Sequence, residues 1–157
     1  MLNDQINAEL YSAYLYWDFA KYFDCEGLKG MAGWYKIQAE EELEHAKKIY
    51  TYMQQQGGAI LFKKIDRNKD VPKGCVEIAR AALKHEREIT RMINDLYAAA
   101  EKEKDYRTMN FLSWFIDEQA EEETNARDVV QLMKLAGESQ AALYIADVQM
   151  GKRKKAA

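Results

Sequence analysis

The chain has 157 residues, 31% of them charged, a formal net charge of -3 and a single proline. This length fits one domain with a sizeable core, and the composition indicates an all-helical, all-α fold. The mild charge gives no sign of nucleic-acid binding, and neither an 18-residue apolar run nor a leader pattern is present, so we expect a cytoplasmic protein without a membrane partner.

Two amphipathic helices are predicted first, over residues 2–24 and 27–57, each with a buried stripe at alternating steps of four and three residues. The first stripe consists of Leu2, Ile6, Glu9, Ala13, Tyr16, Ala20 and Phe23. The second consists of Leu28, Met31, Tyr35, Gln38, Glu42, His45, Ile49 and Tyr52. Metal-ligand side chains therefore interrupt both stripes, and Glu42 and His45, three residues apart, share one face.

Two more long helices are predicted over residues 73–104 and 106–136, followed by a short fifth helix over 139–149. The third stripe consists of Cys75, Ala79, Ala82, Glu86, Ile89, Ile93, Leu96 and Ala100, and the fourth of Leu112, Phe115, Gln119, Glu122, Ala126, Val129, Met133 and Ala136. We expect residues 1–150 to form the single domain and residues 151–157 a frayed basic tail. Cys25 and Cys75 match no zinc or redox spacing and are expected to be reduced thiols.

The four buried stripes hold four glutamates but no lysine or arginine. Burying an ionised carboxylate without a partner costs several kcal/mol, so this core must either keep the carboxyls protonated or bind cations. Five carboxylate and imidazole ligands suit two divalent ions that share a carboxylate, and iron, manganese and zinc all fit such a set. As isolated residues, each could instead be a misjudged helix face or a hydrogen-bonded core group.

The ligand positions also predict how the helices pair. The midpoint between Glu9 and Glu42 falls at the turn between the first two helices, and the midpoint between Glu86 and Glu122 falls beside Asp105, which can cap the fourth helix. Both hairpins therefore place their ligands at one level. The stretch from residue 58 to 72 is long for a helix connection, and we expect a crossover along the bundle that leaves the second and third helices parallel.

Four motifs carry a resemblance to a known family. Residues 7–16 (NAELYSAYLY), 38–45 (QAEEELEH), 84–86 (KHE) and 110–123 (NFLSWFIDEQAEEE) resemble the prokaryotic non-haem ferritins over nearly the whole chain. The resemblance implies a ferritin-like four-helix bundle with a long crossover between the second and third helices and a short fifth helix. It also implies a homo-oligomeric cage of 24 subunits that stores an Fe(III) mineral.

The resemblance further implies a di-iron ferroxidase centre that oxidises Fe(II) with dioxygen or peroxide. Glu9, Glu42 and His45 would hold the first iron, Glu42 would bridge, Glu86 and Glu122 would hold the second, and Gln119 would lie close to the open face. Glu41, Glu118 and Glu121, with Glu122, match a third iron site, although on spacing alone these three would be solvated surface charges. Tyr16 matches a tyrosine that hydrogen bonds at the centre and can supply an electron.

The sequence alone leaves alternative functions open. By the same resemblance, Leu43 stands at the position where haem-binding bacterioferritins have a methionine. No haem is therefore expected. A second hypothesis is a small di-metal oxidase or peroxide-consuming enzyme that keeps the bundle without the cage, and particle size separates it from storage. A third, a metal-free helical interaction module, predicts apolar residues where the four glutamates stand.

Overall fold

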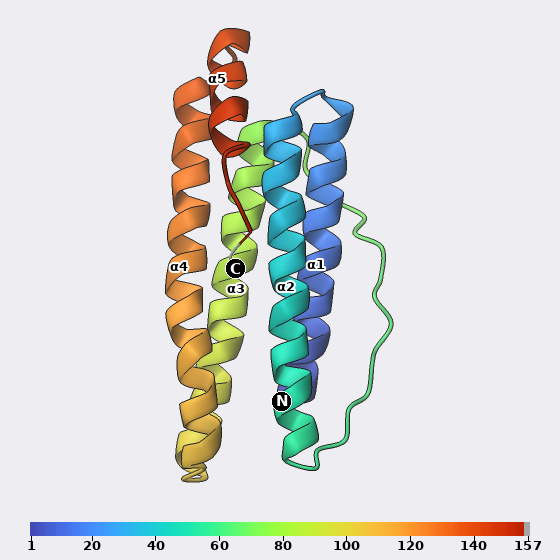
Figure 1. Ribbon diagram of the computed structural model, residues 1–157, viewed down its shortest axis with the longest axis vertical. Coiled ribbons are helices and arrows are strands. Elements are labelled where there is room, and N and C mark those ends of the chain that lie inside the picture. The colour runs from blue at the N-terminus through green and yellow to red at the C-terminus, as the bar shows by residue number, and fades with distance from the viewer. Residues whose placement is uncertain (156–157) are drawn as a thin grey trace.

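A computed structural model describes residues 1–155 of the chain, and in that range it contains five helices and no strand. The helices are α1 (Leu2–Cys25), α2 (Lys29–Gln55), α3 (Cys75–Lys102), α4 (Tyr106–Ala136) and α5 (Gln140–Met150). Each begins and ends within two residues of its predicted limits. The all-α prediction is therefore confirmed, and four long helices form an upright bundle with α5 at one end (Figure 1).

Two antiparallel hairpins make up the bundle, α1 with α2 and α3 with α4 (Figure 1). The first turn passes through Gly27 at φ +77°, a left-handed conformation that glycine adopts without strain. The second turn ends at Asp105, whose side chain accepts a hydrogen bond from the Thr108 backbone N–H at 3.1 Å. This N-cap is the one that the sequence predicted.

The connection between α2 and α3 runs the length of the bundle outside α1, so that α2 and α3 point the same way (Figure 1). Two asparagines of α1 fasten it. The Asn3 Oδ1 accepts from the Leu61 backbone N–H at 2.7 Å, and the Asn7 Oδ1 accepts from the Lys63 N–H at 2.6 Å. The predicted crossover is confirmed, and polar side chains of α1 supply the hydrogen bonds that its irregular backbone lacks.

The interior has three layers along the bundle axis. One apolar cluster includes Phe19, Phe23, Met31, Tyr35, Ile78 and Met133, and another includes Ile6, Ile49, Ile89, Ile93, Leu112 and Phe115. A group of buried polar residues contacts the first cluster through Tyr16 and the second through Phe115: Gln5, Glu9, Ser12, Gln38, Glu42, His45, Glu86, Gln119 and Glu122. The carboxylates thus lie in a dry core, where unbalanced charge is expensive.

The short helix α5 docks on the start of α2. Gly30 makes this possible, because a Cβ at that position would lie 1.8 Å from the Asp147 carbonyl oxygen. The Asp147 side chain also accepts from the Met31 N–H at 2.8 Å. The α5 helix therefore ends beside α2, and the residues that follow it lie against α2.

None of the helices within residues 1–155 combines the length and the apolar character that a membrane crossing requires. Cys25 and Cys75 are both free thiols, as expected.

Candidate metal centre

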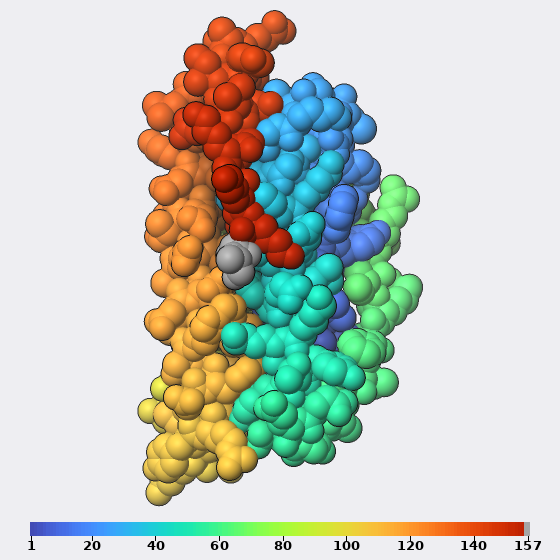
Figure 2. Space-filling model, viewed as in Figure 1, coloured from blue at the N-terminus to red at the C-terminus, as the bar shows by residue number. Residues whose placement is uncertain are grey.

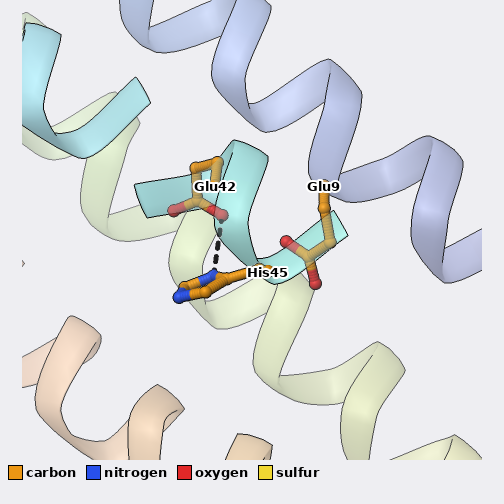
Figure 3. A group of neighbouring side chains, drawn as sticks. All are labelled: Glu9, Glu42 and His45. Carbon is orange, nitrogen blue, oxygen red and sulfur yellow. Dashed lines mark hydrogen bonds and ion pairs between the residues drawn. The ribbon is translucent and has the colours of Figure 1, made fainter. Parts of the chain in front are cut away.

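The most compact group of ligand-type side chains joins the two helices of the first hairpin. Glu9 of α1 meets Glu42 and His45 of α2, and one potential ligand atom from each lies within 4.8 Å of the others (Figure 3). The His45 Nδ1 lies 3.2 Å from the Glu42 Oε2. The three-residue spacing of Glu42 and His45 therefore brings them together on one face.

His45 also faces the second hairpin. Its Nε2 lies 3.6 Å from the Glu118 Oε1, and ligand atoms of His45, Glu118 and Glu122 again lie within 4.8 Å of one another. The edge of the Trp114 ring packs against the imidazole, with 5.5 Å between the ring centroids. A single imidazole thus lies between the carboxylates of α1 and α2 and those of α4.

Glu86 of α3 lies on the far side of this group. Its Oε1 accepts a hydrogen bond from the Tyr16 hydroxyl, and its Oε2 accepts from the Gln119 side-chain amide at 3.2 Å. Burial raises the pKa of Glu86, and the charge of Glu122 raises it further. All four glutamates of the predicted stripes therefore belong to one electrostatic cluster, to which each long helix contributes.

Two further amides, which were not among the predicted site residues, support the carboxylates. The Gln5 Nε2 donates to the Glu9 Oε1 at 2.7 Å. The Gln38 Nε2 donates to the Glu42 Oε1 at 3.1 Å and to the Glu122 Oε2 at 2.7 Å. Each glutamine stands four residues before a stripe glutamate, and this spacing on one helix face was the signal available in the sequence.

Burial dominates the titration of the carboxyls. It raises the pKa of Glu9 well above its ordinary value and raises that of Glu42, and in each case a neighbouring glutamate adds repulsion. Burial together with like-charge repulsion raises the pKa of Glu86 and of Glu122 to about 8. Without bound cations, these two carboxyls therefore hold their protons at neutral pH.

The pKa of the His45 imidazole is also raised, but for a different reason. Burial alone would lower the pKa of His45, but hydrogen bonds to Glu118 and Glu42 outweigh it and raise the pKa to about 11. The protonated imidazole places a positive charge 3.2 Å from Glu42 and 3.6 Å from Glu118. A metal ion that takes its place must displace that proton, since a metal-bound imidazole is neutral.

The donor set fits a divalent cation. The Glu9 Oε2 is buried and finds no hydrogen-bond partner among residues 1–155, although it belongs to a side chain that is only 1% exposed. A buried carboxyl oxygen without a donor must either carry a proton or bind a cation. Oxygen ligands with one nitrogen suit iron, manganese or zinc, so the geometry agrees with the chemistry inferred from the sequence.

The three residues matched to a third iron site lie in different surroundings. Glu118 faces His45, whereas Glu41 forms an ion pair with Arg153 from the C-terminal segment. Glu121 is exposed and forms no ion pair with any residue that the structure describes. These side chains therefore do not converge on one point in this arrangement.

His85, which lies next to Glu86 in the sequence, is not directed at the cluster. Its Nε2 lies 2.7 Å from the Ser12 Oγ, and its ring packs against Tyr11 and Tyr16. Burial lowers the pKa of His85 to about 4, so it is neutral at ordinary pH. This agrees with leaving it out of the predicted ligands.

Comparisons with known proteins point to one family. A family model described as a ferritin-like domain matches residues 1–136. The bacterial non-heme ferritin of Staphylococcus haemolyticus is 37% identical over 152 residues, which cover 97% of this chain and 92% of that protein. A probable bacterial non-heme ferritin-like protein of Haemophilus influenzae is 33% identical over 151 residues, covering 96% of this chain and 92% of its own.

Solved structures agree with these relatives. An open pore ferritin from the archaeon Archaeoglobus fulgidus superimposes with a TM-score of 0.94 at 39% sequence identity. The match covers 98% of this chain and 94% of that one. The similarity extends through all four helices that carry the carboxylate cluster.

Proposed function

Since the chain belongs to the ferritin family, we propose that it stores iron and is a ferroxidase, oxidising Fe(II) at a di-iron centre and depositing Fe(III) inside a homo-oligomeric cage of 24 subunits. The observation that carries this proposal is the compact group of Glu9, Glu42 and His45 with its unpartnered carboxylate oxygen. Iron here is the substrate, and haem has no part in the proposal.

In the proposed centre, Glu9, Glu42 and His45 bind one Fe(II), and Glu86 and Glu122 bind the second. Glu42, which has carboxylate neighbours on both sides, is the shared ligand. Each Fe(II) gives up one electron, and dioxygen takes up two electrons and two protons to become hydrogen peroxide. Peroxide itself can serve as an alternative oxidant.

The remaining polar residues act by positioning. The three amides of Gln5, Gln38 and Gln119 donate to the carboxylates and hold them in place for the incoming ions. Tyr16 donates to Glu86, and we propose that its hydroxyl keeps this contact at the loaded centre, where the tyrosine can supply an electron. Outer hydrogen-bond partners of this kind tune metal affinity.

Protons leave as iron enters. Because the pKa values of Glu86 and Glu122 are about 8 and that of His45 is about 11, Fe(II) binding at neutral pH replaces protons on these groups. The metal therefore relieves the charge crowding that burial imposes. We also propose that Glu41, Glu118 and Glu121 receive iron at an outer site, which requires Glu41 to give up its ion pair with Arg153.

Aerobic iron loading tests both halves of the proposal. Fe(II) is added to the metal-free protein, Fe(III) absorbance is followed by stopped flow, and the product is separated by size with iron detection. We expect oxidation well above the protein-free rate and iron that elutes with a particle near 24 subunits. A background oxidation rate would refute the ferroxidase, and a dimer at every salt concentration would refute cage storage and favour the non-cage oxidase.

A further inference from the structure

The segment after α5 continues along the bundle instead of leaving it. In Figure 1 it descends from the end of α5 towards the middle of the molecule, and Figure 2 shows its atoms lying over α2 beside α4. Lys155 reaches Glu40 of α2 with 3.2 Å between Nζ and Oε2. A frayed basic end was expected for residues 151–157; Arg153 and Lys155 contact α2, and residues 156–157 lie outside the described part of the chain.

Arg153 makes the closest contacts of this segment. Its guanidinium carbon lies 4.2 Å from the centroid of the Trp34 ring, in cation–π geometry. One terminal nitrogen donates to the Gln38 Oε1 at 2.9 Å, and the other donates to Glu41. The side chains of Arg153 and Glu41 are each only 18% exposed, so this ion pair is shielded more than a surface pair would be.

The contact with Gln38 reaches the metal centre in one step. A guanidinium can only donate hydrogen bonds, so it fixes the Gln38 oxygen on the outer side. The amide nitrogen must then point inward, where it donates to Glu42 and Glu122. With no donor outside, the amide could turn over and present its oxygen to two carboxylates.

The contact with Glu41 affects whether the cluster can bind a third metal ion. The guanidinium that binds Glu41 also binds Gln38, whose amide donates to Glu42 and Glu122, so the Glu41 carboxylate lies at the edge of the same cluster. Arg153 occupies that carboxylate. Beside it lies a hollow of about 530 Å³ between the tail and α4, lined in part by Trp34 and Asp128, which gives the arginine room to move away.

We propose that Arg153 is a positioning residue of the metal centre: it orients Gln38 towards Glu42 and Glu122, and by occupying Glu41 it limits the centre to two metal ions until the tail is displaced. This inference rests on the proposed function of the cluster. The basic tail thereby gains a role: its Arg153 occupies the Glu41 carboxylate and is replaced there by a metal ion.

The test uses Co²⁺ alone on the metal-free full chain, with bound metal measured by equilibrium dialysis and the visible spectrum of Co²⁺. The variant is Arg153→Gln, and the matched control is Lys154→Gln, which removes the same charge from an exposed tail residue that makes no ion pair within residues 1–155. Near-ultraviolet circular dichroism verifies that each variant keeps the wild-type packing.

We expect the unchanged chain and Lys154→Gln to bind two Co²⁺ per subunit. Arg153→Gln is expected to bind the first two about tenfold more weakly, since loss of an outer hydrogen-bond partner lowers metal affinity by about 10- to 100-fold, and to bind a third ion. Adding Glu41→Gln to Arg153→Gln should abolish the third ion and leave the weakened pair.

Two results separate the possible failures. If the unchanged chain binds two Co²⁺ and Arg153→Gln matches it in affinity, number of ions and spectrum, the role of Arg153 is overturned while the metal centre stands. If the unchanged chain binds no Co²⁺ at all, the proposed function fails, and the role of Arg153 fails with it.

Discussion

Replacing Glu122 with glutamine removes one buried carboxyl from the cluster and keeps its shape. The side chain is only 4% exposed, and its Oε2 accepts from Gln38 at 2.7 Å, a bond that a glutamine oxygen can accept equally. Burial, followed by repulsion from Glu42, raises the pKa of Glu122 from 4.5 to about 8. The substitution therefore isolates the energetic effect of a proton that the folded chain holds more tightly than the unfolded chain.

The sign follows from proton binding. Between pH 4.5 and about 8 the unfolded carboxyl is ionised while the folded one keeps its proton, so the free energy of unfolding falls as pH rises. Each pKa unit corresponds to about 1.4 kcal/mol, so raising the pH from 5.5 to 7.5 removes about 3 kcal/mol of unfolding free energy through this group. The Glu122→Gln chain lacks this loss.

Urea unfolding of the metal-free chain at these two pH values measures the difference, at one protein concentration because assembly adds to apparent stability. We expect the stability of Glu122→Gln relative to the unchanged chain to rise by about 3 kcal/mol between pH 5.5 and 7.5. Glu121→Gln, the same substitution at the exposed neighbour, should show no such rise. Equal pH dependence in the unchanged chain and Glu122→Gln would refute the reasoning.

Three further outcomes are expected. Glu42→Ala should slow Fe(II) oxidation at least tenfold in stopped flow while leaving a folded metal-free chain, because it removes the shared ligand and relieves repulsion; an unchanged rate would exclude the assignment, and Glu44→Ala, at an exposed site, is the control. Calorimetric titration with Co²⁺ at pH 7 in buffers of different ionisation enthalpy should reveal the release of more than one proton per chain, including that of His45; no release would contradict the raised pKa values. Gly30→Ala should lower the free energy of unfolding by about 1–3 kcal/mol in urea because its Cβ meets the α5 backbone, whereas Gly33→Ala, with open space around it, should raise it by up to about 1 kcal/mol.

Most of the cluster could be predicted because its information is local. Alternating steps of four and three residues fix which side chains face the core, and they identified Glu9, Glu42, Glu86 and Glu122 before any packing was known. The level of each pair followed from the position of the turns, since two antiparallel helices of equal rise meet at equal distances from their connection. Gln5 and Gln38 obey the same local rule.

The contacts of the tail could not be predicted in this way. Arg153 reaches Gln38, 115 residues away in sequence, because α5 reverses direction and docks at Gly30. Neither the composition of the tail nor its periodicity indicates that reversal. The dispersal of Glu41, Glu118 and Glu121 depends likewise on which partner each flexible side chain meets, and Arg153 is one of those partners.

Protons and metal ions compete for the same carboxylates, and this links stability to metal binding. As pH rises towards 8, the metal-free chain loses stability because Glu86 and Glu122 must either ionise in a dry core or hold their protons against an increasingly basic solvent. Over the same range, metal binding strengthens because fewer protons have to be displaced. The stabilisation of the chain by a divalent ion must therefore grow with pH, and the buried glutamates that weaken the empty bundle are the ones that make it bind metal.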